Sequence, residues 1–600
     1  MNIFYDTARK LGAYNDIKNC LIKGYTPLAV TGVSAIHKAH LAAALSSLGS
    51  CLLICDDEAN ATKMAADINE MAGEQIACVY PAKDMNFAYM EGISREYEHR
   101  RIEALSAVRS GRCRVMAASM EACMQGTIPP NALAEYTFEI ALGGTLDIEE
   151  LQRKLLASGY SRTDQVEGAA QFAVRGSIVD IFPVQEKQPV RVELWGDEVD
   201  TLAYFDTESQ RRTDNIESIS IAPALEIIFP SSEELIKRLE ELAKGARGKL
   251  ADKIKENINK DIDLVNSGIT LTDLDKYYTL AYPETATVFD YFSGGACIVS
   301  EYSNCIEKGK AALAQLSEDL KILYTEGILF KKLEGFCLDM GQTESRIVNM
   351  KTVFFDTFMR SMGSVKLKKL INTDCRQTAA WGGSMISLEE ELNTLVENDY
   401  CTIVLAGSEK TVPIIVNDLK ESGIPAVQMK EDSPIAPRTV YVRTGSLSAG
   451  YDYPDIKCAL ITQMKAMTSK RKKPKHKAGE EIKALSDIHT GDLVVHSMYG
   501  IGKFQGIRNI ETNGVKKDYI TINYAGTDVL YVPVTQLDLV SRYIGPGDDG
   551  AVKLNKLNST EWTRTRSKVR AAVKDMAEEL TKLYAQRQMA KGYAFDPDDD

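Results

Sequence analysis

Residues 20–125 alternate short apolar runs with segments of helical periodicity, and this alternation constrains the fold more than any other feature of the chain. The apolar runs are rich in Ala, Val, Ile and Leu and lie at 27–32, 50–57, 76–82 and 114–119. Runs of this length that are separated by helices are typical of buried strands in a parallel sheet. We therefore predict an α/β domain over residues 1–125.

The first of these runs leads into a segment with the build of a phosphate-binding loop, residues 26–45, TPLAVTGVSAIHKAHLAAAL. The functional pattern is G-x-x-x-x-G-K-[ST], whose lysine reaches the phosphates and whose hydroxyl binds Mg²⁺. Here the frame holds Gly32, His37, Lys38 and Ala39, so the second glycine and the hydroxyl are replaced. We interpret the segment as the degenerate loop of an ATPase-like fold kept as a scaffold, with no bound cofactor and no catalytic residue. A chance strand–turn–helix is the alternative.

Composition narrows the class of protein. A chain of 600 residues is too long for one hydrophobic core and suggests about four domains. Its net charge of -13 argues against a protein that coats nucleic acid through bulk charge. No apolar run is long enough to span a bilayer and the N-terminus has no secretory pattern, so we expect a cytoplasmic protein without membrane contact. The twelve cysteines lack zinc-site spacing, which favours reduced thiols and no metal site.

Downstream of residue 125 the sequence changes character several times. Period-2 segments broken by glycines indicate hairpins at 128–225, and charged helical sequence follows, with its clearest helix predicted over 231–254. We predict a mixed α/β multidomain protein that consists of a degenerate helicase-like α/β domain (1–125), an inserted α+β domain (126–228), a helical and α/β part of the same module (229–348), a second, small α/β domain (349–462), a basic linker (463–485), a small β-barrel (486–545) and a long C-terminal helix (546–600).

The inserted domain carries a long family resemblance. Its segments are 159–183, GYSRTDQVEGAAQFAVRGSIVDIFP, then 190–211, VRVELWGDEVDTLAYFDTESQR, and 221–226, IAPALE. Together they resemble the UvrB-like module of bacterial nucleotide excision repair, in which this small domain docks onto UvrA. The resemblance therefore implies UvrA as a partner.

By position, the resemblance assigns the UvrA contact to Arg162, Arg175 and Gly176. Arginine suits this role because its planar guanidinium pairs with carboxylates through two parallel hydrogen bonds. A solvated charge on a hairpin is the alternative interpretation of each arginine.

Residues 491–511, GDLVVHSMYGIGKFQGIRNIE, and 519–543, YITINYAGTDVLYVPVTQLDLVSRY, carry a second resemblance. They are similar to the RNA-polymerase-interacting domain that transcription-repair coupling factors share with CarD-like regulators. The resemblance implies a small barrel of the SH3/Tudor kind that binds the β subunit of RNA polymerase. In this family the barrel adds to an exposed sheet edge of its partner, a recurring mode of recognition.

For the polymerase contact the resemblance points to the segment around Ile510, together with Gly500, Gly502 and Tyr531. The two glycines permit tight turns. For Ile510, a core position in a strand is the alternative.

The order of these parts resembles the N-terminal half of transcription-repair coupling factors. Besides the two domains it includes a basic linker at 470–477, KRKKPKHK, and a long amphipathic helix from Ser559 onward. The resemblance implies a full-length protein that recognises stalled RNA polymerase, translocates on double-stranded DNA with ATP, displaces the polymerase and recruits UvrA. ATP, Mg²⁺ and DNA would belong to a motor expected past Asp600, and residues 1–600 would be an adaptor without catalysis.

Two other functions stay open at this point. A CarD-like transcription regulator would bind polymerase and use the rest of the chain as a scaffold. An ATP-using, UvrB-like or helicase-like enzyme would depend on Lys38. Loss of UvrA binding on substitution of Arg162 and Arg175 would argue against the first, and ATP turnover that depends on Lys38 would support the second.

Overall fold

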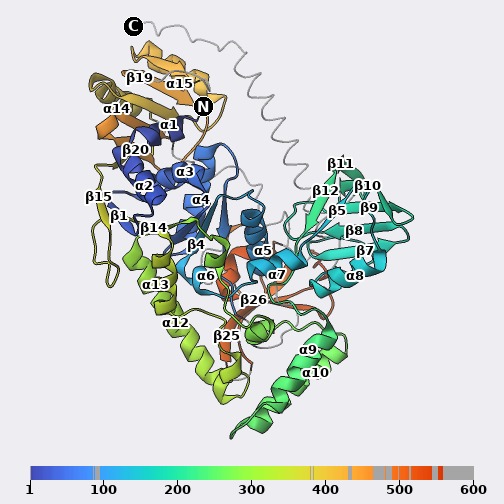
Figure 1. Cartoon of the computed structure of the whole chain (residues 1–600). Coiled ribbons are helices and arrows are strands. Elements are labelled where there is room, and N and C mark those ends of the chain that lie inside the picture. The colour runs from blue at the N-terminus through green and yellow to red at the C-terminus, as the bar shows by residue number, and fades with distance from the viewer. Residues whose placement is uncertain are drawn as a thin grey trace.

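The computed structural model describes residues 2–85, 87, 95–207, 209–378, 380–382, 384–429, 436–463, 480–481, 489–497, 499–512, 515–543, 552–557 and 562. Figure 1 shows a large sheet near the centre, a second α/β unit above it, an antiparallel sheet to the right and a pair of helices that projects below. Within these ranges, no helix is both long and apolar enough to cross a membrane. In the same ranges, no group of three or more His, Cys, Asp or Glu side chains could hold a metal ion.

The central sheet consists of parallel strands in the order β15-β1-β14-β13-β2-β4-β3. Its strands are β1 (Leu28–Thr31), β2 (Cys51–Cys55), β3 (Ala77–Tyr80), β4 (Val115–Ser119), β13 (Ala296–Ser300), β14 (Lys351–Asp356) and β15 (Lys369–Asn372). Successive side chains of a strand point to opposite faces, and those of β1, β2 and β4 enter two separate hydrophobic cores. The sheet is therefore buried on both faces, as its continuous apolar strands predict.

Helices cover both faces of this sheet. They are α1 (Ile3–Lys10), α2 (Gly12–Lys23), α3 (Ala35–Leu45), α4 (Glu58–Ala72), α5 (Glu96–Arg109), α6 (Met120–Met124), α7 (Pro130–Tyr136), α11 (Tyr278–Ala281), α12 (Tyr302–Thr325) and α13 (Met340–Asn349). The four strands predicted within residues 1–125 are confirmed. Three further strands of the same sheet come from residues 296–372, where the sequence gives no indication of which sheet they join.

The inserted domain contains a sheet in the order β11-β10-β9-β8-β7-β6, in which β7 to β11 form an antiparallel meander and β6 pairs with β7 in parallel. Its elements are α8 (Ile148–Ala157), β6 (Ser161–Arg162), β7 (Gln171–Arg175), β8 (Ile178–Phe182), β9 (Val190–Trp195), β10 (Glu198–Phe205) and β11 (Arg212–Asn215). The short β5 (Phe138–Ala141), at the start of the domain's sequence, pairs with β12 (Ser218–Ile221), near its end. One face of the meander packs on α8 and on the β5–β12 pair in a hydrophobic core to which Ile102 of α5 also contributes.

The helix predicted over 231–254 is wrong in its extent, because the structure contains two helices there. Helix α9 (Ser232–Lys244) and helix α10 (Ala251–Asn266) form a hairpin. The break contains Gly245 and Gly248, and Gly248 has a φ of 92°, which a helix cannot contain.

A second α/β unit has the strand order β16-β20-β21-β17-β19-β18. Its elements are β16 (Arg376–Thr378), α14 (Met385–Glu397), β17 (Cys401–Leu405), α15 (Thr411–Glu421), β18 (Ala426–Gln428), β19 (Thr439–Arg443), β20 (Gly450–Tyr453) and β21 (Cys458–Thr462). The predicted strands at 401 and 426 and the helix between them are confirmed. One face of this sheet shares a hydrophobic core with α1 to α4, so the two α/β units pack directly against each other.

The last sheet is antiparallel, in the order β22-β27-β23-β24-β25-β26. Its strands are β22 (Glu480–Glu481), β23 (Leu493–His496), β24 (Gly500–Thr512), β25 (Val515–Asn523), β26 (Val529–Pro533) and β27 (Val540–Arg542). The predicted basic linker at 470–477 lies outside the described residues. Of the predicted C-terminal helix (546–600), only residues 552–557 and Trp562 are described, and residues 552–557 do not form a helix.

Candidate functional site

The degenerate phosphate loop lies at the carboxyl end of β1, between that strand and α3. Gly32 has a φ of 82°, and a Cβ atom at this position would lie 2.3 Å from the carbonyl oxygen of Thr373. The chain that follows β15 therefore crosses closely over the glycine. Gly32 is needed here for the close approach of protein backbone.

The lysine of the loop is engaged by the protein itself. The ammonium of Lys38 is buried and forms an ion pair with Glu301, which directly follows β13. The same Glu301 carboxylate oxygen accepts hydrogen bonds from Thr357, from the backbone N–H at 2.9 Å and from the hydroxyl at 2.5 Å. Burial alone would raise the pKa of Glu301, but the hydrogen bonds from Lys38 and Thr357 lower it below its usual value. A phosphate would have to displace an ionised carboxylate to reach this lysine.

The helix that follows the loop is covered by the second α/β unit. His37, at the position of the lost glycine, has its Nε2 3.2 Å from the carbonyl oxygen of Arg376 and packs edge-on against Tyr453, with ring centroids 5.3 Å apart. His40 lies 2.8 Å from the Tyr453 hydroxyl and 2.7 Å from the carbonyl oxygen of Phe4. Burial lowers the pKa of both histidines to about 4, so both are neutral at pH 7.

Ala39, the residue in place of the Mg²⁺-binding hydroxyl, is fully buried in the core beneath. The loop and the first turns of α3 thus join two α/β units through buried side chains. Sequence reasoning missed Glu301 as the partner of Lys38. The available signal was the apolar run that forms β13 and ends in this glutamate.

A second buried cluster of charges lies where the inserted domain joins the central sheet. The guanidinium of Arg101 and the carboxylate of Glu226 are both inaccessible to solvent and lie 2.9 Å apart. Lys83 pairs with the other oxygen of Glu226 at 2.7 Å and with Asp275 at 2.8 Å. Burial would raise the pKa of Glu226, but Arg101 and Lys83 lower it to about 2. This fully paired cluster fixes the end of the inserted domain to the body.

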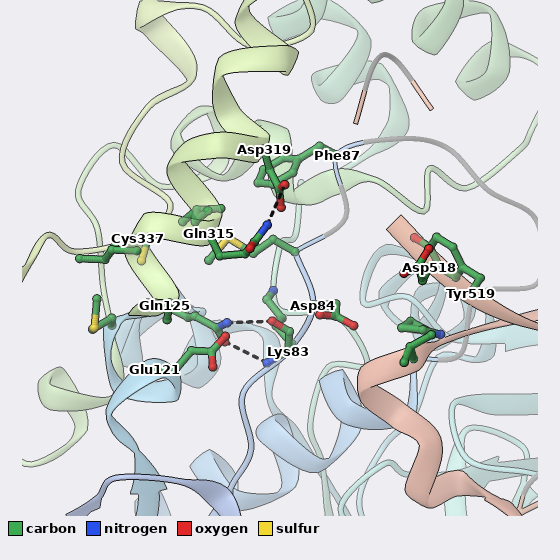
Figure 2. Close-up of a pocket in the computed structure, with 17 residues that line it drawn as sticks. Lys83, Asp84, Phe87, Glu121, Gln125, Gln315, Asp319, Cys337, Asp518 and Tyr519 are labelled. Atoms are coloured by element: carbon green, nitrogen blue, oxygen red, sulfur yellow. Dashed lines mark hydrogen bonds between the residues drawn. The ribbon is translucent and has the colours of Figure 1, made fainter. Parts of the chain in front are cut away.

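A cavity of about 430 Å³ adjoins this cluster between α12, residues 83–85 and 87, and the last sheet. Figure 2 shows Lys83 and Gln125 on its floor, Asp319 of α12 on one side, and Asp518 and Tyr519 of β25 on the other. Hydrogen bonds run from Gln125 Nε2 to the Lys83 carbonyl at 2.8 Å and from the Lys83 N–H to Gln125 Oε1 at 2.9 Å. The cavity therefore marks the contact between the last sheet and the central module.

The arginines predicted in the inserted domain lie on two neighbouring strands. Arg162 is exposed on the short edge strand β6, opposite Phe172 of β7. Arg175 ends β7 and is followed by Gly176, whose φ of 63° allows the tight turn into β8. Arg175 donates to the buried carboxylate of Asp180, yet its side chain stays 46% exposed.

Asp180 is held from a second side, because Arg191 of β9 donates to its two oxygens at 2.7 and 2.9 Å. The Arg191 guanidinium also lies 4.5 Å above the centre of the Phe205 ring. These contacts fix the strands that carry Arg175 and give the outer face of the meander an array of exposed and half-buried arginines.

The residues predicted to contact RNA polymerase are spread along the last sheet. Ile510 pairs with Lys517 near the far end of the β24–β25 hairpin, and its side chain lies outside what the structure describes. Gly500 and Gly502 begin β24 and pair with β23, so they lie about 30 Å from Ile510 along the strand. Tyr531 of β26 is half-buried opposite Thr521. The structure therefore does not bring the four residues together.

Close packing explains the two glycines. A Cβ at Gly500 would lie 2.6 Å from Oδ1 of Asn555, and one at Gly502 would lie 2.4 Å from Ile522. Asn555 in turn accepts a hydrogen bond from the N–H of Ile501 at 2.7 Å. Gly500 therefore lets the segment after the sheet pack across the start of β24, and Gly502 lets the side chain of Ile522 in β25 pack closely against β24.

The end of the β24–β25 hairpin extends beyond its neighbours in the sheet. Strand β23 pairs only with the residues at 500–503 of β24, and β26 only with those at 519–523 of β25. Among the described strands, residues 506–512 of β24 pair with β25 alone. This leaves a strand edge on which another strand can add.

Two domain families match the chain. The UvrB interaction domain matches residues 138–226, which comprise the whole meander with β5 and β12. The CarD-like/TRCF RID domain matches residues 488–544, which comprise the last sheet from β23 to β27. The matches thus fall on the two parts of the structure that carry the predicted partner-binding residues.

Similarity to curated proteins extends over nearly the whole chain. It is 29% identical over 601 residues to the transcription-repair-coupling factor of Bacillus subtilis (strain 168), which covers 98% of this chain and 51% of that protein. It is 30% identical over 596 residues to the transcription-repair-coupling factor of Staphylococcus haemolyticus, covering 96% of this chain and 50% of that protein. The chain spans about half the length of the relatives it matches. Both domains and the similarity over nearly the whole chain thus relate it to half the length of proteins named transcription-repair-coupling factor.

Proposed function

We propose that this chain acts in transcription-coupled DNA repair as an adaptor with two ends, one for stalled RNA polymerase and one for UvrA. The observation that carries the proposal is the presence of a UvrB interaction domain and a CarD-like/TRCF RID domain on one chain. A transcription regulator of the CarD kind would need only the second of these. The long similarity to proteins named transcription-repair-coupling factors supports the same function.

The polymerase end is the β24–β25 hairpin. Residues 506–512 of β24 pair with β25 alone among the described strands, so this strand edge fits the addition of a strand from the partner, and the partner we propose is the β subunit of RNA polymerase. Ile510 lies within this edge, whereas Gly500 and Gly502 act by allowing packing at the other end of β24. We propose that the antiparallel sheet curls into a small barrel of the SH3/Tudor kind.

The UvrA end is the outer face of the inserted domain. Arg175 is exposed there next to the turn at Gly176, whereas Arg162 is exposed on the adjacent edge strand β6, where it pairs with the buried Phe172 and so lies toward the other face of the sheet. Guanidinium groups on rigid strands suit carboxylates on a partner, because little conformational freedom is lost when the hydrogen bonds form.

Nucleotide chemistry belongs elsewhere in the whole protein. The ion pair of Lys38 with Glu301 and the burial of His37 and Ala39 disfavour a nucleotide at the degenerate loop. ATP, Mg²⁺ and double-stranded DNA would be bound by a motor in the part of the relatives' length that this chain does not span. The adaptor would work in the cytoplasm, where its proposed partners act.

Binding of residues 1–600 to RNA polymerase core enzyme tests the polymerase end. We expect the wild-type chain to bind and Ile510→Asp to weaken binding at least about 30-fold, because a charge at the added edge must be desolvated. Ile386→Asp is the matched control, since Ile386 is 71% exposed on α14, far along the chain from the hairpin. Equal binding by all three proteins would contradict the assignment of the edge, and no binding by any would contradict the polymerase end altogether.

Addition of UvrA to the polymerase complex tests the adaptor as a whole. We expect a ternary complex on size-exclusion chromatography with wild-type chain and only the polymerase complex with the double variant Arg162→Ala, Arg175→Ala. A polymerase complex that never takes up UvrA would favour the CarD-like regulator instead.

A further inference from the structure

The outer face of the inserted domain carries one large apolar side chain that the structure leaves in solvent. Trp195 ends β9 and is 83% exposed. Along this strand the side chains of Val190, Val192 and Leu194 are buried, whereas those of Arg191 and Glu193 are half-buried on the outer face. The alternation places Trp195 on the same outer face as the arginine array.

The turn that presents Trp195 is held rigidly. Gly196 has a φ of 63°, which suits the tight turn between β9 and β10. The loop after β5 is hydrogen-bonded to the far side of this turn, from the Leu146 N–H to the Asp197 carbonyl at 2.7 Å and in both directions between Val199 and residues 143–144 at 2.8 Å. Trp195 is therefore presented by a backbone that needs little further ordering on binding, which favours affinity.

The same turn lies beside the turn that carries Arg175. The Leu194 N–H donates to the carbonyl of Ser177 at 2.9 Å, and Glu193 pairs with Ile178 across the two strands. Arg175 pairs in turn with Ile178. Two strand spacings and two residues along the strand separate Arg175 from Trp195, a distance of about 12 Å. Both side chains fit within the roughly 800 Å² that one partner buries in a typical interface.

We propose that Trp195 is a principal anchor for UvrA, buried in an apolar pocket of UvrA while Arg175 pairs with a carboxylate beside that pocket. The inference rests on the proposed UvrA-binding function of this domain and adds the residue that dominates its affinity. Tryptophan and arginine are the side chains most enriched among residues that carry binding energy, and they act where the partner excludes water around them.

The chemistry at the turn defines the partner surface more closely. Asp197 and Glu198 follow Trp195 in the turn, and Glu198 is its cross-strand neighbour. The rim of the UvrA pocket therefore carries basic groups on the side of this turn and acidic groups on the side of Arg175. This change of sign across one patch fixes the orientation of the docked domain.

Titration of UvrA against the whole 600-residue chain tests the anchor. The variants are Trp195→Ala and Trp195→Phe, with Phe358→Ala as the control because Phe358 is a similarly exposed aromatic residue, at 72%, on the central module. We expect Trp195→Ala to raise the Kd about 30-fold or more, Trp195→Phe to raise it less, and Phe358→Ala to leave it unchanged. Since Trp195 is in solvent, its removal should leave the melting temperature of the chain unchanged.

The outcomes separate the anchor from the proposed function. Wild-type binding that Trp195→Ala leaves within about threefold would overturn the anchor and leave UvrA binding intact. An equal loss of UvrA affinity in Trp195→Ala and Phe358→Ala would also overturn the anchor, because removal of any exposed aromatic residue would then have the same effect. A wild-type chain that does not bind UvrA would overturn both the anchor and the UvrA end of the proposed function.

Discussion

At the scale of single residues, Lys38 occupies the lysine position of a phosphate-binding loop but forms a buried ion pair with Glu301. The Lys38 side chain is 3% exposed and that of Glu301 is 19% exposed, so removal of one partner leaves the charge of the other without compensation in a buried site. We predict that Lys38→Met lowers the free energy of unfolding by about 3 kcal/mol, measured by urea denaturation. The double variant Lys38→Met, Glu301→Met should lose less free energy of unfolding than Lys38→Met alone, because it leaves no unpaired charge in the site.

The enzyme interpretation makes the opposite prediction for the same variant. If Lys38 served ATP hydrolysis, Lys38→Met would abolish turnover and leave stability nearly unchanged. A malachite green assay on the wild type and the variant decides between the two, and turnover that depends on Lys38 would contradict the scaffold role.

Because two buried histidines of α3 lie at the contact between the α/β units, the stability of the chain depends on pH. Burial lowers the pKa of His37 and His40 to about 4, below the 6.5 of an unfolded histidine. Between these values the unfolded chain binds more protons than the folded one, so stability is complete above pH 6.5 and falls as the pH drops toward 4. The loss is about 1.4 kcal/mol per histidine for each pH unit within this window.

Thermal melting of the chain between pH 8 and pH 5 measures this effect. We expect the wild-type melting temperature to fall below pH 6.5, and the double variant His37→Gln, His40→Gln to melt lower at pH 8 but with a flatter pH profile. Parallel profiles for the two proteins would show that other groups dominate the titration.

At the scale of elements, the local sequence pattern predicts that a strand exists better than it predicts which sheet the strand joins. The four strands of residues 1–125 were predictable because each is a continuous apolar run between helices. Strand β13 is a similar apolar run, yet it was not predicted as a strand, because the sequence around it within residues 229–348 is dominated by charged helical segments. The union of β13, β14 and β15 with β1 depends on contacts between residues more than 200 positions apart, which no local periodicity contains.

The same limit applies to the candidate sites. The position of Arg175 at a turn followed from its glycine neighbour, and the degenerate loop followed from the residues at its motif positions. The pairing of Lys38 with Glu301 could not follow from either, because 263 residues separate them. Trp195 was equally unpredicted, since alternation assigns its face only once the buried partners of β9 are known.

At the scale of the whole molecule, both parts proposed to bind partners pack against the central module, and Glu226 lies where the inserted domain joins it. The residue ends the matched UvrB interaction domain, pairs with Arg101 and Lys83, and has its backbone N–H bonded to Glu98 at 2.8 Å. A neutral side chain at this position would leave two buried cations short of their shared counter-ion.

We therefore predict that Glu226→Gln destabilises the junction by about 3–5 kcal/mol and opens the chain to proteases on either side of residues 138–226. Limited trypsin digestion, followed by mass spectrometry of the first fragments, measures the opening. Glu240→Gln, at an exposed pair on α9, should digest like the wild type. Because Trp195 and Arg175 belong to the meander itself, the released domain should still bind UvrA, while polymerase binding should stay with the remainder. Digestion of Glu226→Gln at the wild-type rate would show that the apolar contacts alone hold the domain in place.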